Sequence, residues 1–139
     1  QRELWNIKSK SVALQLRSND RLEFTVKLNP VVQRNGKMHD VIMDAKKSNP
    51  NEHIQQEKVL LSWLQKREQS WGVNFAPQVL LNEYSVESFK KGRHPVRIST
   101  VDIKGILQIT EPKKFIEQYN VGFGRAKGFG CGLMLIRRV

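Results

Sequence analysis

A glycine-dense stretch near the C-terminal end has the composition of a phosphate-binding loop. Residues 122–132 read GFGRAKGFGCG, with five glycines in eleven positions. Glycine reaches positive φ and lets backbone N–H groups approach a ligand closely, and cations beside such groups hold phosphate oxygens. We therefore predict a phosphate cradle over residues 124–128, in which Gly124 and Gly128 supply backbone while Arg125 and Lys127 supply charge.

The same stretch does not fit the common nucleotide-binding motifs. A Walker A loop requires a second glycine five positions after Gly122, where the chain has Lys127. A dinucleotide-binding fingerprint requires its third glycine one position before Gly128 and a helix after it. Residues 127–130 match the first half of the RNP1 motif of RRM domains, but residues 131–134 lack the aromatic side chains that stack on bases. A nucleotide-binding enzyme built on this loop is therefore the weakest hypothesis.

A second cluster of cations precedes the glycine-dense stretch. Gly92 and Pro95 predict a hairpin tip between two strands, and five basic side chains surround it: Lys90, Lys91, Arg93, His94 and Arg97. A protruding basic hairpin is suited to an RNA groove, where it neutralises phosphates on both walls. We predict that these five residues bind RNA.

His94 is the one histidine that lies among cations. Metal-free RNA cleavage needs a base for the ribose 2′-hydroxyl and a cation that stabilises the transition state. His94 is therefore the fallback catalytic residue of this chain, although contact with a phosphate or plain exposure to solvent is favoured over catalysis.

Composition and charge support a basic domain that binds a polyanion. The chain has 139 residues and a formal net charge of +11, and such a positive field attracts nucleic acid. Residues 86–139 carry 11 of the cations against 4 carboxylates. The single cysteine, Cys131, excludes a disulfide framework, and the three histidines show no metal-ligand spacing. We expect no metal, no cofactor and no membrane contact.

Hydrophobic periodicity predicts the elements that must position these residues. Alternation predicts strands at 11–16, 22–32, 39–43, 79–86 and 96–109, and an apolar run predicts another at 133–136. Helical spacing predicts a long helix over 52–70 that ends at Gly72, and Pro112 begins a short helix that runs to about residue 119. Trp63, Phe115 and Cys131 are predicted to be core residues. Residues 22–136 then follow the β-α-β-β-α-β order of a ferredoxin-like α+β fold, with an antiparallel sheet and both helices on one face.

Two segments resemble the CasE family, the CRISPR RNA endoribonucleases of the Cascade complex within the RAMP superfamily. The strand FTVKLNP at 24–30 resembles the opening of that family's second, C-terminal domain, and residues 122–133 resemble its glycine-rich signature. The helix that contains Ser62–Leu64 and the basic hairpin before Gly105 lie in the expected places.

The resemblance implies a function and a domain organisation. Residues 1–21 would be a linker and an edge strand from a missing first domain, and residues 22–139 would be the C-terminal ferredoxin-like RAMP domain. The family cleaves precursor CRISPR RNA at the repeat stem-loop without metal, and its catalytic histidine lies in the first domain. We therefore expect no catalytic residue in this chain and little activity from the chain alone.

The resemblance also implies partners and a cellular location. The expected partners are the CRISPR repeat stem-loop, the first domain and other Cascade subunits, in a prokaryotic cytoplasm. A homodimer through an uncovered face, with Trp5 and residues 11–16 as its apolar part, is a further possibility. The alternative hypothesis from a different class is a non-catalytic basic RNA-binding protein with a ferredoxin-like fold.

Overall fold

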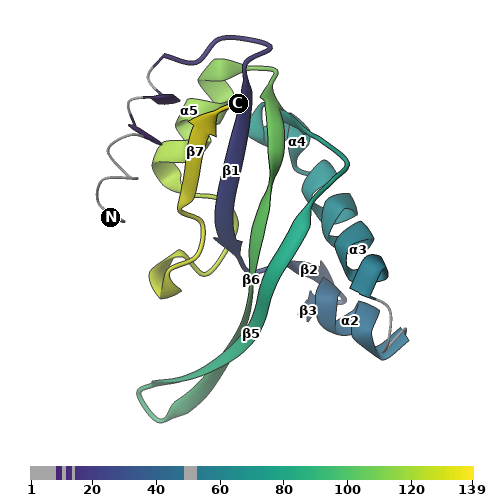
Figure 1. Ribbon diagram of the computed structural model, residues 1–139. Coiled ribbons are helices and arrows are strands. Elements are labelled where there is room, and N and C mark those ends of the chain that lie inside the picture. Colours follow the sequence, from purple (N-terminus) through teal and green to yellow (C-terminus); the bar gives the residue numbers. More distant parts are fainter. Residues whose placement is uncertain (1–8, 11, 14, 49–52) are drawn as a thin grey trace.

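An antiparallel sheet forms the centre of the structure, a computed structural model that describes residues 9–10, 12–13, 15–48 and 53–139 (Figure 1). Strand β1 (Arg21–Leu28) lies between β7 (Met134–Arg138) and β6 (His94–Ile109). The far side of β6 pairs with β4 (Val73–Phe75) near its end and with β5 (Leu80–Lys91) along most of its length. With β4 and β5 counted as one interrupted strand, this is the strand order of a ferredoxin-like sheet, which confirms the predicted fold class.

The helices cover one face of this sheet (Figure 1). They are α3 (His53–Gln65), α4 (Glu68–Trp71) and α5 (Pro112–Val121). Because side chains alternate along a strand, β1 buries Leu22, Phe24, Val26 and Leu28 against the helices. The predicted core residues Trp63, Phe115 and Cys131 are all buried. The open face of the sheet carries polar residues instead, and Glu23 at its centre forms ion pairs with Lys104 and Arg137.

An insertion after β1 differs from the prediction. The strand expected at 39–43 ends at Asp40, because β2 (Val31–Arg34) and β3 (Lys37–Asp40) form a small hairpin and α2 (Val41–Ser48) follows directly. The Asp40 carboxylate accepts the backbone N–H groups of Ile42 and Met43 at 2.8 and 3.0 Å, which is the geometry of a helix N-cap. The apolar run at 41–43 therefore begins a helix, and its periodicity was too short to distinguish the two states.

The segment before β1 also differs from the prediction. Val12 and Ala13 have helical backbone, so the strand expected at 11–16 is wrong for the residues described there. Ser9 lies against the edge strand β7, where its hydroxyl donates to the carbonyl of Ile136 and accepts the N–H of the same residue. This contact satisfies two backbone groups on an otherwise open sheet edge. Trp5 lies outside the described residues.

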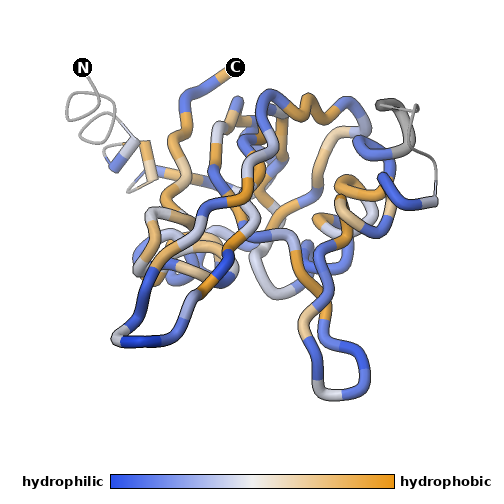
Figure 2. The backbone as a smooth tube through the Cα atoms, turned by 90° about the horizontal axis from the view of Figure 1, so that it is seen from below, coloured by the Kyte–Doolittle hydropathy of each residue, from blue (hydrophilic) through white to orange (hydrophobic). Residues whose placement is uncertain are grey.

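The long strands β5 and β6 continue beyond the sheet as a two-stranded ribbon (Figure 1). We call residues 86–98 of this ribbon the arm. The hydrophilic ends of the arm and of the β2–β3 hairpin project from the body, whereas hydrophobic positions gather at its centre (Figure 2). In the described part of the chain, no helix is long and apolar enough to cross a membrane.

Candidate nucleic-acid interface

The arm presents its cations to solvent on both faces of the ribbon. Lys90, Lys91, Arg93, His94 and Arg97 are all exposed, and none forms an ion pair with a described residue. Lys91 is paired with His94, so these two share one face, whereas Lys90 and Arg97 lie opposite Pro95 and Ser88 on the other face. Both faces of the arm can therefore contact phosphates, as an element lying between two strands of a nucleic acid requires.

The base of the arm is fixed to the α2 insertion. The Tyr84 hydroxyl donates to the carboxylate of Asp40 at 2.8 Å, and the ammonium group of Lys46 lies 4.1 Å from the centre of the Tyr84 ring. Burial and the Asp40 carboxylate raise the pKa of Tyr84, so its hydroxyl stays protonated as the donor. On the neighbouring strand, the Asn29 side chain donates to the carbonyl of Ser99. These contacts orient the arm relative to the body.

The glycine-dense stretch forms a closed loop with a tight neck. The N–H of Phe123 donates to the carbonyl of Gly132, and the N–H of Gly132 donates to the carbonyl of Lys27. Gly132 has φ +92°, and a Cβ atom there would lie 2.6 Å from the Phe123 carbonyl oxygen. Glycine at this position is therefore required both by conformation and by space.

Within this loop, backbone donors are available for a ligand. The N–H groups of residues 124–128 donate to no acceptor in the described part of the chain, whereas those of 129–132 are used within the loop or by Lys27. Gly124 and Ala126 have positive φ, and such local backbone reversals direct successive N–H groups into an anion-binding concavity. These N–H groups are available to a ligand, and the phosphate cradle itself stays a prediction.

The side chains of the two loop cations, Arg125 and Lys127, lie in different surroundings. The side chain of Lys127 lies alongside Gly122 within the loop, because a Cβ on that glycine would be 3.3 Å from its Cδ and Cε atoms. Arg125 instead lines a hollow against the β2–β3 hairpin. The sequence analysis placed both cations at one phosphate, and that assignment stays a prediction; no local pattern showed that Arg125 also lines a hollow against the β2–β3 hairpin.

An aromatic contact that the sequence analysis missed joins the two basic features. Phe129, in the 3₁₀ helix η1 (Lys127–Phe129), lies with its ring centre 4.8 Å from that of Phe89 in the arm. Phe89 is on the same ribbon face as Lys91 and His94. The only sequence signal was a phenylalanine in each basic cluster. The contact makes the arm and the glycine loop one continuous surface.

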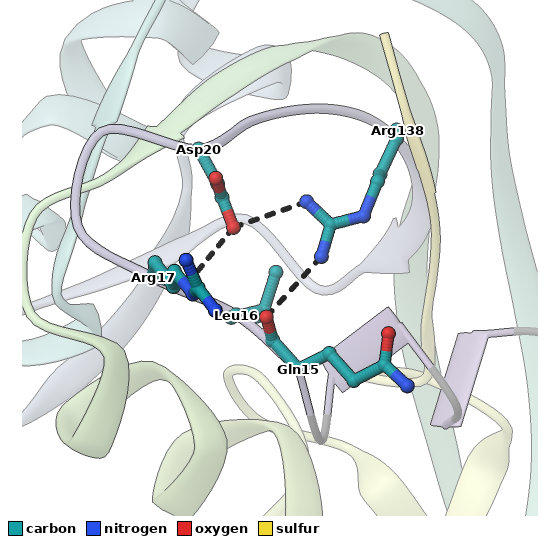
Figure 3. A pocket seen from close by; sticks show the side chains of 5 residues that line it. All are labelled: Gln15, Leu16, Arg17, Asp20 and Arg138. Atoms are coloured by element: carbon teal, nitrogen blue, oxygen red, sulfur yellow. Dashed lines mark hydrogen bonds and ion pairs between the residues drawn. The ribbon is translucent and has the colours of Figure 1, made fainter.

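The polar contacts beside β7 are structural. In a hollow of about 540 Å³ beside β7, the Arg138 guanidinium lies between the Asp20 carboxylate and the carbonyl of Gln15 (Figure 3). The backbone N–H of Arg17 also donates to Asp20, and these bonds hold the pKa of Asp20 below its usual range.

Burial raises the pKa of the Cys131 thiol, which favours the unreactive protonated form. Among the residues that the structure describes, no three His, Cys, Asp or Glu side chains converge on a metal site.

Fold and charge together define a basic ferredoxin-like domain with a protruding arm and a glycine loop. A model of the family described as CRISPR associated protein matches residues 1–138. The chain therefore belongs to that family of CRISPR-associated proteins. A comparison with curated proteins found no match.

Solved structures with the same fold come from CRISPR systems. CRISPR endoribonuclease Cse3 bound to 19 nt RNA superposes with a TM-score of 0.69 and 18% identity, over 88% of this chain and 58% of that one. Cse3 from Thermus thermophilus, bound to an RNA that represents a pre-cleavage complex, gives 0.68 and 19%, over 88% and 55%. Cas6e from Escherichia coli K-12 gives 0.60 and 24%, over 90% and 64%. This chain thus spans less than two-thirds of the length of these proteins.

Proposed function

We propose that this chain is the C-terminal RNA-binding domain of a CRISPR-associated endoribonuclease that cleaves precursor CRISPR RNA at the repeat stem-loop. The observation that carries the proposal is the continuous surface formed by the arm and the glycine loop. It combines exposed cations that lack carboxylate partners in the described chain with free backbone donors. The similarity in fold to an endoribonuclease bound to RNA supports the same assignment.

The residues have different roles in this proposal. Lys90, Lys91, Arg93, His94 and Arg97 contact backbone phosphates of the stem, because they lie on both faces of a narrow ribbon. The N–H groups of Gly124–Gly128 hold a phosphate beside the stem, with Lys127 as the nearby cation.

In this proposal, another part of the whole protein carries out the cleavage reaction. The His94 ring is exposed at the arm tip and receives no orienting hydrogen bond from a described residue, whereas a general base must be held close to the proton it removes. We infer that metal-independent cleavage depends on a first domain that supplies the catalytic histidine, that residues 22–139 form the second domain, and that the chain alone is inactive. The whole protein would act with other Cascade subunits in the prokaryotic cytoplasm.

A binding and cleavage assay tests the proposal. A labelled CRISPR repeat hairpin, an unrelated hairpin and a single strand are incubated with the chain in EDTA, with and without a separately supplied first domain. We expect preference for the repeat hairpin and cleavage only when the first domain is added. Equal, salt-sensitive binding to every RNA with no cleavage would instead support the general RNA-binding protein, and cleavage by the chain alone would implicate His94.

Substitutions in the arm identify the binding surface. The double variant K90A/R93A removes two proposed duplex contacts, so the slope of log affinity against log salt should fall by about 1.8, at about 0.9 for each phosphate contact. Lys113→Ala, an exposed cation on α5, is the matched control and should leave the slope unchanged. An unchanged slope in K90A/R93A would remove the arm from the RNA interface.

A further inference from the structure

A separate cluster of cations surrounds a hollow between the β2–β3 hairpin, the end of α3 and the glycine loop. The hollow measures about 440 Å³, which is within the range of small-molecule sites. Three of its lining residues are Lys66, Arg67 and Arg125, and the remaining ones are Val31, Val32, Gln33 and Met38. No carboxylate lines this hollow, and none of the three cations forms an ion pair with a described residue.

Trp63 brings the three walls of the hollow together. Its indole N–H donates to the carbonyl of Val31 at 3.0 Å and so holds β2. The guanidinium of Arg67 lies 3.5 Å from the centre of the Trp63 ring and donates to the Trp63 carbonyl. A Cβ at Gly124 would be 3.9 Å from the edge of the same ring, so the residue before Arg125 packs on Trp63 as well. One buried side chain thus positions cations from segments far apart in the sequence.

Burial of the Arg67 guanidinium has an electrostatic cost, which the Trp63 ring contact reduces but which no carboxylate of the described chain offsets. The side chain is half-buried, and this burial lowers the pKa of its guanidinium. Its one described hydrogen bond goes to a backbone carbonyl, although a guanidinium has five N–H donors. Removing a cation from water is unfavourable unless an anion compensates. A bound phosphate would supply that compensation, and a guanidinium fits two phosphate oxygens at once.

The remaining lining residues of the hollow suit a nucleotide better than a phosphate ion alone. Val31, Val32 and Met38 give an apolar side, and Met38 is 43% exposed. The face of an unpaired RNA base can be buried against such an apolar wall or stack on an Arg guanidinium, while its edges stay free for hydrogen bonds; the faces of paired bases are hidden in the stack. Gln33 supplies an amide that can bond to a base edge. The combination of three cations with an apolar wall is therefore that of a site for single-stranded RNA.

The hollow lies on the same end of the sheet as the arm. The β2–β3 hairpin, the glycine loop and the arm all lie at the end where β1 finishes (Figure 1). An RNA that engages the arm with its stem can therefore continue into the hollow with an unpaired flank.

We propose that Lys66, Arg67 and Arg125 bind a backbone phosphate of single-stranded RNA that flanks the stem, with the adjoining base against Val32 and Met38. This inference rests on the proposed function in one respect, the assignment of the strand to the flank of the repeat stem. The binding of single-stranded RNA by the hollow does not depend on the proposed function. The arm would then bind the paired stem of an RNA, and the hollow would bind the unpaired flank of the same RNA.

The test compares two RNAs and two kinds of variant. The ligands are a repeat hairpin without flanks and the same hairpin with an unpaired extension on each side. Lys66→Ala and the double variant K66A/R125A remove cations of the hollow, and Lys58→Ala is the matched control, because it is an exposed lysine on α3, the helix that ends just before Lys66. Arg67 is not substituted alone, since its contact with Trp63 also supports the fold.

The expected result is a loss confined to the extended RNA. K66A/R125A should reduce the salt slope for that RNA by about 0.7, the value for one phosphate contact on a single strand, and K66A should reduce it by less because Arg67 and Arg125 remain. Lys58→Ala should change neither RNA. Equal slopes for wild type and K66A/R125A on the extended RNA would overturn the proposal, as would an equal loss on both RNAs.

A short oligouridylate separates this inference from the proposed function. If the chain shows no preference for the repeat hairpin but K66A/R125A still weakens oligouridylate binding, the proposed function fails and the single-strand site stands. If oligouridylate binding is unchanged while binding of polyglutamate depends on Lys66 and Arg125, the hollow is an acidic-protein site and the RNA inference is wrong.

Discussion

Individual residues of the glycine loop have different structural roles. Gly132 closes the neck against Phe123 and allows no side chain, whereas Gly130 has a positive φ but nothing within 4 Å of a Cβ. Gly124 lies beside Leu28 and Trp63 and so connects the loop to the core. The loop thus keeps its shape through a few positions, while the N–H groups of residues 124–128 remain available.

The two loop glycines make a matched pair for a stability measurement. Gly132→Ala should lower the free energy of unfolding by about 3 kcal/mol, because it adds a clash with the Phe123 backbone to the strain of positive φ. Gly130→Ala should cost only about 1 kcal/mol, which is the strain alone. Urea unfolding measures both. Equal losses would show that the neck can widen to admit a methyl group.

Glu23 gives the open face of the sheet a pH dependence. Hydrogen bonds from Lys104 and Arg137 hold the pKa of this carboxyl below its ordinary value of 4.5. The lowered pKa means that the folded state binds the proton less tightly than the unfolded state does. The resulting stabilisation is present above pH 4.5 and is lost as the pH falls through the lowered value.

Thermal unfolding from pH 2 to 7 tests this dependence. The difference in Tm between wild type and Glu23→Gln should be largest near pH 7 and should shrink below pH 4.5. Glu117→Gln on α5 is the control, because Glu117 is exposed and outside the ion pairs of the described chain. A Tm difference for Glu23→Gln that stays constant with pH would contradict the assignment.

At the scale of elements, the α2 insertion supports the arm through one carboxylate. Asp40 caps α2 with one oxygen and accepts the Tyr84 hydroxyl with the other. Tyr84→Phe should cost about 1 kcal/mol, the net value of one hydrogen bond. Asp40→Ala should cost about 2–3 kcal/mol, since it removes the cap as well.

The double variant distinguishes a shared contact from two independent ones. Because Asp40→Ala already removes the acceptor, adding Tyr84→Phe should cost nothing further in urea unfolding. Additive losses would mean that the two residues act separately and that α2 does not orient the arm.

The second support of the arm is its contact with the glycine loop. Phe89→Ala removes the ring contact with Phe129, so the amides of the arm should exchange with solvent faster while those that pair β1 with β6 keep their protection. Hydrogen exchange measures this directly. Ser88→Ala is the control, because Ser88 is exposed on the opposite ribbon face. Unchanged exchange in Phe89→Ala would show that the ribbon is rigid without the loop.

At the scale of the whole molecule, residues near the two ends of the described chain lie against each other. Ser9 bonds to Ile136, and Arg138 bonds to Gln15 and Asp20 (Figure 3). The segment before β1 is therefore docked on β7 by side-chain contacts.

Limited trypsin digestion tests this docking. Arg138→Ala should increase the rate of cleavage after Arg17 severalfold, because it removes contacts with Gln15 and Asp20 and so raises the population in which the segment is open. Lys58→Ala, an exposed lysine on α3, should leave the rate unchanged. No change in Arg138→Ala would mean that other contacts hold the segment.

The amino-acid sequence by itself determined the ferredoxin-like order, the buried faces and the basic hairpin. These features depend on local periodicity, turn residues and charge, all of which can be read within a few residues. The sequence-based prediction was wrong at 39–43 and for the described residues of 11–16. Short apolar runs there suit a strand or a helix equally well, and at 39–43 the N-cap formed by Asp40 decided for a helix.

Only the tertiary structure decided how the basic residues are grouped. The contact of Phe89 with Phe129 and the meeting of Lys66 and Arg67 with Arg125 join segments that are 40 or more positions apart. Such contacts depend on how elements pack around a buried side chain, here Trp63, and no local pattern records that packing. The sequence therefore predicted which residues would carry positive charge, and the fold determined which of them can hold the same ligand.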